Sequence, residues 1–458
     1  MNQFKNKKIG ILGLGLEGIS SAEFLFKEEA KITILDQKEK NQIESEYLNR
    51  AEKIKADFIL GANYLDSLDQ FDLLVRSPGI KKDQDIFINT NVPITSQTKI
   101  FFDLCPCQII GVTGTKGKGT TSALIYEMLE KEGRDVYLVG NIGNPPLNIL
   151  NKLDTQSIVV FELSSFQLHD MEKSPHVAVM LMVTSEHLDY HKDTASYIDA
   201  KRNILKFQND TDFAIINRDY PASNESDVHT LGKIYNVSRE QEILGPGCFI
   251  KNGAVWFRDA GEEEEVIECS EINIPGKHNW ENVCASVVVA RIEGVKYKNI
   301  IEVLKSFEGL EHRLELVDTI RGVRFYDDSF STIPETAIAA IEAFSDPEIL
   351  ILGGSSKNSN FEELGRVISE AENIKAIIGI GKEWERLKSQ ILNPKYKILF
   401  IEGAKDMETV VKAASKIAET GDVVILSPAC ASFDMFKNYK DRGEQFKKEV
   451  KKLRENLN

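Results

Sequence analysis

The sequence predicts a mostly parallel α/β protein built from three domains in series. Its 458 residues are too many for one ordinary domain. Short apolar runs alternate with helical stretches, as in parallel sheets that helices cover on both faces. Two of these runs lead into glycine-rich turns that open a helix, at Gly13–Gly18 and Gly114–Gly119. Such turns hold phosphate groups at helix N-termini, so nucleotide binding is expected.

The composition sets limits on the class of protein. Hydrophobic residues make up 42% and charged residues 28% of the chain, as in soluble globular proteins. The net charge of -15 argues against general binding to nucleic acid or anionic membranes. Six cysteines are too few for a disulfide framework, so we expect reduced thiols. We find no signal-peptide pattern and no apolar run of bilayer length, and we expect a cytoplasmic protein.

The first section, residues 1–97, opens with a βαβ unit. We expect a strand over Lys8–Leu14, a helix over Ile19–Lys27 and a strand over Lys31–Leu35. Two further apolar runs cover Phe58–Leu60 and Leu73–Val75.

The turn after the first strand reads GxGxxG from Gly13 to Gly18, and Asp36 ends the second strand. In this context the glycines let the backbone approach a pyrophosphate, while the acid can accept hydrogen bonds from ribose hydroxyls. The alternative is a tight turn that needs glycine only for packing. The motif alone does not specify NAD.

The second section, residues 98–308, contains the other glycine turn. Its expected strands are Ile109–Val112, Ser157–Phe161, Val177–Val183, Phe213–Asn217, Gly232–Val237, Cys248–Ile250 and Ala254–Phe257. The acidic run Glu262–Glu265 is expected to be a solvated turn. Helices are expected over Trp280–Glu293 and Lys298–Phe307.

The sequence GVTGTKGKGTT, from Gly111 to Thr121, predicts a phosphate-binding loop. Its glycines free backbone N–H groups to face phosphate, and Lys118 adds a positive charge. Gly119 stands where such loops place Ser or Thr, so the metal-binding hydroxyl is expected one or two places later. The alternative is a glycine-rich turn with an incidental lysine.

Two strand ends in this section carry candidate metal ligands. Glu162 follows the strand that begins at Ser157, and a carboxylate there is well placed to hold Mg²⁺ beside a terminal phosphate. His187 follows the next strand, and a surface or capping role is its alternative. Lys201 lies on a helix expected over Thr194–Phe207, and its ordinary interpretation is a solvated helix face.

The third section, residues 309–458, again alternates strands with helical stretches. Its expected strands are Gly322–Tyr326, Glu348–Leu352, Ala376–Ile380, Val423–Leu426 and, as a fifth candidate, Lys397–Ile401.

Seven sequence features in fixed order resemble the Mur ligases over nearly the whole chain. They are GVTGTKGKGTT, FELSSFQL, TSEHLD, Lys201, GKHNWEN, EHR and SPACASFDMFKNYKDRGEQF, and the last is similar to the glutamate-adding branch. The resemblance implies a Rossmann-like UDP-binding domain, a P-loop ATPase-like central domain and a Rossmann-like C-terminal domain. These match the sections 1–97, 98–308 and 309–458.

The resemblance also implies a reaction. ATP would activate the carboxylate of UDP-N-acetylmuramoyl-L-alanine (UDP-MurNAc-L-Ala) as an acyl phosphate, and the amine of glutamate, with D-glutamate expected, would then form an amide in peptidoglycan synthesis. We expect Mg²⁺, small-molecule partners only, and a monomer that neither binds nucleic acid nor inserts into membranes.

The residues that the resemblance assigns to ATP, metal and catalysis gather around the phosphate loop. Those expected to bind ATP are Gly114, Thr115, Lys116, Gly117, Lys118, Gly119, Thr120, Thr121, Asn279, Asn282, Arg313 and Asp328. Those expected to be catalytic are Lys118, Glu162, His187 and Lys201. Those expected to bind metal are Thr120, Glu162, His187 and Lys201, the last as a carbamate (N6-carboxylysine).

The resemblance assigns two further sets to the substrates. Those expected at the UDP-substrate site are Leu16, Glu17, Gly18, Asp36, Ser77, Gly79, Asn141 and Ser164. Those expected to bind glutamate are Thr332, Lys357, Ser432 and Phe433. Helix caps at Thr332 and Ser432, and an ordinary surface lysine at 357, are their alternatives.

Two positions depart from the glutamate-adding branch. One is Gly119, since folylpolyglutamate synthetases carry a similar Gly-Lys-Gly-Ser. The other is Phe330, which stands where that branch usually has a lysine, so the choice between L- and D-glutamate stays open. The other hypotheses are a folylpolyglutamate-like ligase, an NAD-dependent oxidoreductase and an inactive nucleotide-binding regulator.

Overall fold

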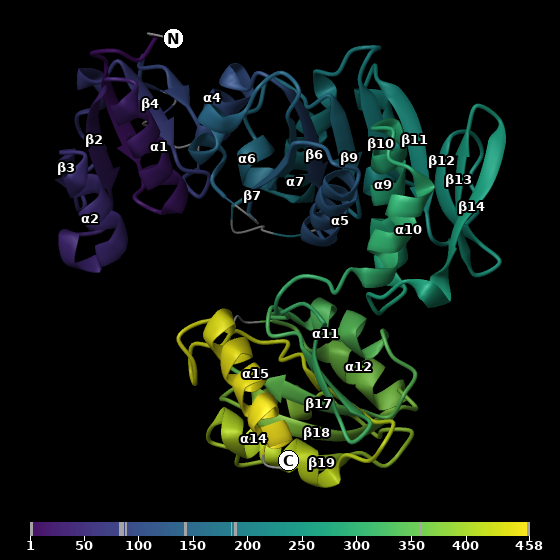
Figure 1. Ribbon diagram of the computed structural model, residues 1–458. Helices are drawn as coiled ribbons and strands as arrows, with labels where there is room; N and C mark the ends of the chain where they lie inside the picture. The colour runs from purple at the N-terminus through teal and green to yellow at the C-terminus, as the bar shows by residue number, and fades with distance from the viewer. Residues whose placement is uncertain are drawn as a thin grey trace. The chain divides into compact units, whose positions relative to one another are not determined.

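The computed structural model confirms an α/β protein with three sheets (Figure 1). It describes residues 3–81, 87, 89–141, 144–184, 186, 190–356 and 359–455. The chain divides into two compact units, Met1–Ile267 with Glu281–Val303, and Glu268–Trp280 with Leu304–Asn458. Two sheets belong to the first unit and one to the second.

The N-terminal sheet has the strand order β3-β2-β1-β4-β5, and every neighbouring pair is parallel. Its strands are β1 Lys8–Leu12, β2 Lys31–Asp36, β3 Asp57–Leu60, β4 Leu73–Arg76 and β5 Ile94–Thr95. The helices of this part are α1 Leu16–Lys27, α2 Ser45–Lys53 and α4 Gln97–Leu104. Both strands and the helix of the expected βαβ unit are present.

The central sheet has nine strands in the order β14-β13-β12-β11-β10-β9-β6-β8-β7. They are β6 Gln108–Thr113, β7 Val136–Gly140, β8 Ile158–Glu162, β9 Val177–Met180, β10 Phe213–Asn217, β11 Lys233–Ser238, β12 Gly247–Lys251, β13 Ala254–Asp259 and β14 Glu262–Glu268. The helices are α5 Lys118–Lys131, α6 Ser165–Leu168, α7 Thr194–Lys206, α8 Pro221–Asn224, α9 His278–Ile292 and α10 Tyr297–Ser306. From β7 to β12 all pairs are parallel, and β12 pairs with β13 antiparallel.

The acidic run Glu262–Glu265 is not a turn, and that expectation was wrong. It begins strand β14 at the sheet edge, and the turn before it consists of Ala260 and Gly261, both with positive φ. One of its acidic side chains, Glu263, is paired with cations of β12 and β13. Glu263 lies 2.6 Å from the Arg258 guanidinium and 2.8 Å from the Lys251 ammonium. Paired charges are compatible with an edge strand.

The C-terminal sheet has the order β15-β16-β20-β17-β18-β19 and is parallel except for β15 against β16. Its strands are β15 Glu315–Ile320, β16 Val323–Asp327, β17 Glu348–Gly353, β18 Ile374–Ile380, β19 Leu399–Ile401 and β20 Val423–Leu426. Its helices are α11 Pro334–Ile341, α12 Glu362–Glu370, α13 Trp384–Lys388, α14 Met407–Ile417 and α15 Tyr439–Glu455.

Helices cover both faces of this sheet, as alternation along its strands shows. Leu350 and Leu352 of β17 pack with α11 and α12, whereas Ile349 and Ile351 pack with α14 and α15. Successive strand residues point to opposite faces, so the continuous apolar run in β17 serves two cores. Within the described part of the chain, no helix has both the length and the apolar character of a membrane span.

Candidate active site

The phosphate loop lies between the end of β6 and the start of α5, as the sequence predicts. Gly117 caps the helix with φ of 84°, and a Cβ there would lie 2.2 Å from the Asn282 side-chain oxygen. Glycine is therefore required at this position by both conformation and space. The Lys118 ammonium donates to the carbonyls of Gly114 and Thr115, at 3.0 and 3.1 Å, and so lies over the loop.

The threonines of the loop differ in their surroundings. Thr121 is fully buried and donates to Asn282 Oδ1 at 3.3 Å. Thr115 is also buried, and its hydroxyl lies 3.0 Å from both the Tyr197 hydroxyl and the Thr184 amide nitrogen. Thr120 is half-buried, on the first turn of the helix. A hydroxyl offered to a ligand at this helix start is best supplied by Thr120.

Glu162 ends strand β8 with one carboxylate oxygen unsatisfied. The side chain is buried, and Oε1 accepts a long hydrogen bond of 3.5 Å from the Asn141 amide. Oε2 is buried without a hydrogen-bond partner among the described residues. A buried carboxylate oxygen in that state is costly unless a cation meets it, so the site fits a bound metal ion.

Lys201 of α7 is buried, so the solvated-face interpretation was wrong. Only 1% of the residue is exposed, and its ammonium donates to the Gly114 carbonyl at 2.7 Å. The nitrogen also lies 4.8 Å from the centre of the Tyr197 ring. Burial, with the nearby positive charge of Lys118, holds the pKa of Lys201 well below its ordinary value.

The two lysine side chains lie at a cavity of about 190 Å³. Lys118 and Lys201 line it together with Glu186, whose carboxylate pairs with the Lys116 ammonium at 2.8 Å. Two lysine amines of the central domain, those of Lys118 and Lys201, therefore line the same cavity. Three predicted substrate-site residues also line it, namely Glu17, Asn141 and Ser164.

A larger cavity of about 450 Å³ lies at the first glycine turn. Gly13 has φ of 88°, and a Cβ on Gly18 would lie 2.0 Å from the Gly13 carbonyl oxygen, whereas one on Gly15 would meet open space. The outer glycines thus shape the turn, and Gly15 leaves room for a ligand. Asp36 closes this site by accepting from the Leu14 amide at 2.8 Å. The predicted residues that line the cavity are Leu16, Glu17, Asp36, Ser77 and Asn141.

Glu17 lines both cavities and is held in an unusual state. Gln167 donates to its Oε1 at 2.8 Å, while Oε2 is buried without a hydrogen-bond partner among the described residues. Burial raises the pKa of Glu17 to about 7, despite the opposing effects of Gln167 and Arg76. Gln167 was not singled out from the sequence, although it belongs to the FELSSFQL motif. Gln167 also accepts a hydrogen bond from the Ser164 hydroxyl at 3.0 Å, and its bond to Glu17 links the first domain to the central one.

In the second unit, the expected phosphate and ribose ligands surround the end of β16. The Arg313 guanidinium stacks on the Phe330 ring at 4.0 Å, and Phe330 packs edge-on against Tyr439. Asp328 accepts from the Ser427 hydroxyl at 2.7 Å and from the Leu314 amide at 3.2 Å. Burial raises the pKa of Asp328 to about 7.

Part of the expected glutamate site can be described. The amide of exposed Phe433 donates to the Ser355 hydroxyl at 3.1 Å, and Ser432 beside it is buried. This contact brings the loop after β20 next to the loop after β17, which leads toward Lys357. Thr332 is half-buried, and Ile333 rather than Thr332 caps α11. His187 and Lys357 lie outside the described residues.

Asn279 and Asn282, both expected to bind ATP, belong to different compact units of the chain. Asn282 accepts from Thr121 in the first, whereas the Asn279 amide donates to the Pro275 carbonyl at 2.6 Å in the second.

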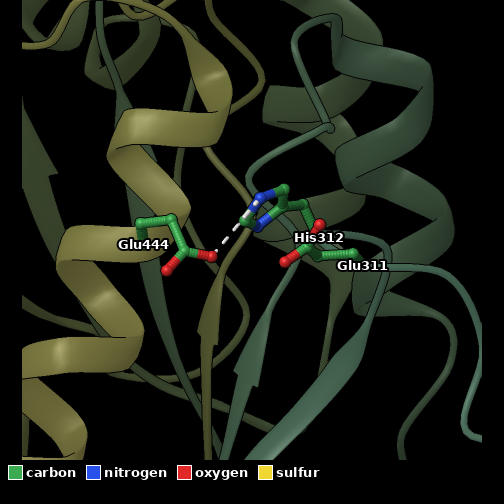
Figure 2. Close-up of side chains that lie close together, drawn as sticks. All are labelled: Glu311, His312 and Glu444. Atoms are coloured by element: carbon green, nitrogen blue, oxygen red, sulfur yellow. Dashed lines mark ion pairs between the residues drawn. The ribbon is translucent and has the colours of Figure 1, made fainter.

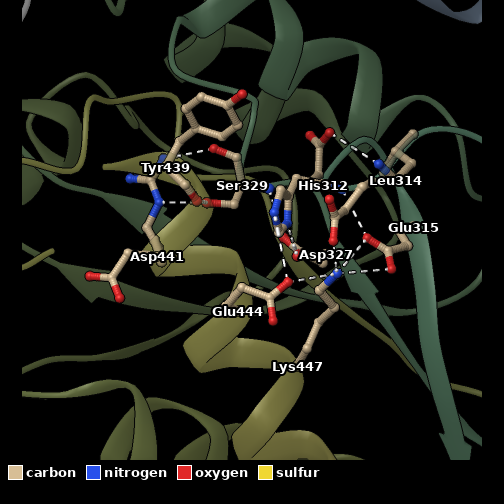
Figure 3. A network of polar contacts seen from close by, with 12 residues as sticks. His312, Leu314, Glu315, Asp327, Ser329, Tyr439, Asp441, Glu444 and Lys447 are labelled. Atoms are coloured by element: carbon tan, nitrogen blue, oxygen red, sulfur yellow. Dashed lines mark hydrogen bonds and ion pairs between the residues drawn. The ribbon is translucent and has the colours of Figure 1, made fainter. Parts of the chain in front are cut away.

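The second unit also contains a buried polar network that sequence reasoning missed, centred on His312 (Figure 3). His312 Nδ1 lies 2.7 Å from Asp327 Oδ2. A Cβ on Gly443 would lie 2.3 Å from that nitrogen, so glycine lets α15 approach the pair. Arg442, next to Gly443, is fully buried and donates to the Ser329 hydroxyl at 2.9 Å. The only sequence signal for this network was indirect, because His312 lies within the EHR motif.

Glu311, His312 and Glu444 lie close enough together to suggest a metal site (Figure 2). However, the Lys447 ammonium lies 3.0 Å from Glu311 and 3.1 Å from Glu444. A side-chain cation therefore already pairs with both acids, and we assign no metal to them.

Three sequence models of known domains match the chain. The Mur ligase MurD-like N-terminal domain matches residues 7–92, the Mur ligase middle domain residues 112–290, and the Mur ligase glutamate ligase domain residues 312–430. These ranges contain both glycine turns, Glu162 and Lys201, and the His312 network in part.

Similar proteins extend over the full length. The UDP-N-acetylmuramoylalanine–D-glutamate ligase of Acetivibrio thermocellus is 39% identical over 98% of this chain and 97% of its own. The enzyme of the same name from Clostridium tetani is 36% identical over 99% of both chains. The crystal structure of MurF ligase from Thermotoga maritima in complex with ADP is similar in fold, with a TM-score of 0.59, 19% identity and coverage of 98% and 96%.

Proposed function

The chain belongs to the Mur ligase family, and from this premise we propose that it joins D-glutamate to UDP-N-acetylmuramoyl-L-alanine at the expense of ATP. The product would be an intermediate of peptidoglycan synthesis. The proposal includes a cytoplasmic location and a monomeric state. A folylpolyglutamate-like ligase is disfavoured because the MurD-like N-terminal domain is present.

One observation carries the proposal: the two cavities share lining residues. Glu17, Pro78 and Asn141 line both the cavity at the first glycine turn and the cavity at Lys118. A nucleotide substrate held at the first turn can therefore extend its acyl end toward the phosphate loop. Its carboxylate and a terminal phosphate would meet beside two lysine amines.

The chemistry explains why these groups must meet. A carboxylate is a poor electrophile, so its oxygen would attack the γ-phosphorus of ATP, releasing ADP and giving an acyl phosphate. The neutral amine of glutamate would then attack the acyl carbon, and phosphate would leave as the amide forms. The first step joins two anions, which Lys118 and the N–H groups of the loop would stabilise.

Members of this family use ATP and Mg²⁺, and the residues here fit a metal ion. Glu162 presents a buried, unsatisfied oxygen, and Thr120 offers a half-buried hydroxyl. We propose that these two residues, with His187 and a carbamate on Lys201, would hold Mg²⁺. When bound, the ion would neutralise charge on the transferring phosphoryl group.

Lys201 supports the carbamate part of this proposal. Burial disfavours its ammonium form, and only a neutral amine adds carbon dioxide, releasing one proton and gaining a carboxylate. That carboxylate would reverse the charge of a side chain that otherwise repels a cation. The Gly114 carbonyl, 2.7 Å away, orients the nitrogen.

We assign glutamate to Thr332, Lys357, Ser432 and Phe433 of the C-terminal domain. A dicarboxylate requires a cation for its distal group, and Lys357 would supply it. Phe330 stands where a lysine is usual in the glutamate-adding branch, and Arg313 stacks on its ring. The Arg313 guanidinium therefore places a positive charge beside position 330, where the usual lysine is absent.

An ADP-release assay tests the function. Purified protein with Mg²⁺ and UDP-MurNAc-L-Ala should release ADP in step with amide product when D-glutamate is added. L-Glutamate should give little release, and Lys118→Ala should abolish it. Equal rates with both isomers would overturn the D-glutamate assignment, and failure to release ADP with either isomer would favour an inactive regulator.

A further inference from the structure

Two cysteines face each other where the first domain joins the second. Cys105 and Cys107 flank Pro106 in the connection between α4 and β6, and their sulfur atoms lie 3.5 Å apart. This connection falls between the matched N-terminal and middle domains.

The backbone explains why the thiols converge. Cys105 has φ of -62° and ψ of 121°, the extended conformation that a residue before proline prefers. In extended backbone, side chains two residues apart point to the same side, and proline restricts the intervening φ. The short sulfur–sulfur distance is therefore built into the local sequence Cys-Pro-Cys.

The pair is also accessible, unlike the other cysteines. Cys105 and Cys107 are half-buried and Pro106 is exposed, whereas the remaining four cysteines are buried. Among these four, Cys248 and Cys284 also interact with each other, but both are completely enclosed. The chain thus contains one accessible and one inaccessible cysteine pair.

The two accessible thiols differ in reactivity. The hydrogen bond between the two sulfur atoms lowers the pKa of Cys105 and raises the pKa of Cys107. A thiolate is the nucleophile in thiol–disulfide exchange. Cys105 is therefore the attacking sulfur and Cys107 the resolving one.

We propose that Cys105 and Cys107 form a redox-active dithiol that disulfide reagents oxidise reversibly to an intramolecular disulfide. The Cys105 thiolate attacks one sulfur of the reagent, which breaks the reagent's S–S bond. Cys107 then attacks the Cys105 sulfur of the mixed disulfide and expels the reagent sulfur that is bonded to it. The protein loses two electrons and two protons, and the reagent takes up both.

Such a disulfide should be easy to reverse. Its ring spans only three residues, so it restricts the unfolded chain little, and a tight or exposed disulfide is more easily reduced than a structural one. Ring closure would tie the end of α4 to the start of β6. Gln97 at the start of α4 lines the larger cavity, and β6 leads into the phosphate loop.

Redox titration of the native protein tests the proposal. The full chain is equilibrated with mixtures of reduced and oxidised dithiothreitol, alkylated after an acid quench, and digested for mass spectrometry. As the mixture becomes oxidising, we expect the peptide with both cysteines to change from a form with two alkyl groups to one with none, two hydrogen atoms lighter than the free dithiol peptide. Cys248 and Cys284 should remain alkylated, and excess reduced reagent should restore both thiols.

Single variants separate ring closure from other oxidation. Cys105→Ser and Cys107→Ser should each abolish the intramolecular disulfide, whereas Cys269→Ser should leave the titration unchanged. Persistence of both alkylated thiols in fully oxidised reagent would overturn the proposal. So would disulfides that join two chains, or equal oxidation of the buried pair.

Discussion

At the scale of single residues, Glu17 is the clearest case of a side chain whose charge matters. It lies in the first turn of α1, beside the glycine turn where a nucleotide diphosphate is proposed to bind. Burial raises the pKa of its carboxyl to about 7, so the neutral form dominates below that pH and the charged form above it. A neutral carboxyl can donate a hydrogen bond, whereas a carboxylate repels phosphate.

We therefore predict that the KM for the UDP-linked substrate rises above pH 7, by up to about tenfold per pH unit. Glu17→Gln keeps a neutral side chain, so its KM should not rise in this range. Steady-state kinetics from pH 6 to 9 measure the effect. Glu23→Gln, on the same helix but paired with Arg50, is the control and should follow the unmodified protein. Parallel pH profiles for Glu17→Gln and the unmodified protein would contradict the prediction.

Lys201 supports a second prediction at this scale. Lys201→Ala removes the nitrogen that would carry the carbamate, so kcat should fall by about a hundredfold or more. A small carboxylate such as acetate should restore part of the rate, because it can occupy the vacated space. Lys206→Ala, at the exposed end of the same helix, should have no effect. Failure of every small carboxylate to restore activity would count against a metal-positioning role.

The positions of several predicted site residues agree with the structure where a local motif fixes them, while their roles stay predictions. The two glycine turns, Glu162 and Asp36 follow directly from their place at a strand end. His312 and Asp327 could not be paired from the sequence, because His312 precedes β15 whereas Asp327 ends β16. Gly443 of α15 packs against both side chains. The burial of Lys201 was equally invisible, since a lysine on a polar helix ordinarily faces water.

At the scale of secondary structure, the strands that were missed share one property. Each ends a sheet in the observed strand order; these strands are β5, β7, β14 and β15. Interior parallel strands are buried on both faces and form continuous apolar runs, which the sequence displays. Strands β14 and β15 carry several charged residues, so β14 resembled a turn and β15 gave no apolar run. Strand β5 has only two residues, and β7, Val-Tyr-Leu-Val-Gly, was missed although it is apolar.

Strand β17 supports a prediction about stability, because it begins with a buried acid. Glu348 is completely buried; Asn373 donates to its Oε1 at 3.0 Å, and burial raises its pKa to about 9. Between pH 4.5 and 9 the folded protein keeps a proton that the unfolded chain releases. Stability should therefore fall as pH rises through this window, by up to about 1.4 kcal/mol per pH unit.

Glu348→Gln removes this dependence, because the amide stays neutral and retains the oxygen that Asn373 contacts. Its melting temperature should exceed that of the unmodified protein at pH 8, and the two should converge near pH 5. Differential scanning fluorimetry across this range measures the gap. Glu385→Gln, an exposed acid of the same domain, should show no gap. A gap that is constant with pH would contradict the assignment to ionisation.

At the scale of the whole molecule, the order of three α/β domains follows from the sequence because each has its own glycine turn or strand series. Which nucleotide the first domain takes does not follow, since GxGxxG with a later acid fits UDP and NAD alike. Family membership favours UDP. The distinction can be tested without catalysis, because a ligand that binds only the folded protein raises its melting temperature.

We predict that UDP raises the melting temperature by several degrees and NAD does not, since a concentration of 100 times Kd stabilises by about 2.7 kcal/mol. Gly15→Val provides the matched control. A Cβ at Gly15 meets open space within the cavity, so this variant should fold normally and lose the response to UDP. Gly18→Ala differs, because its Cβ would collide with the Gly13 carbonyl and lower the melting temperature without ligand. A larger shift with NAD than with UDP, lost in Gly15→Val, would assign the first domain to a redox cofactor instead.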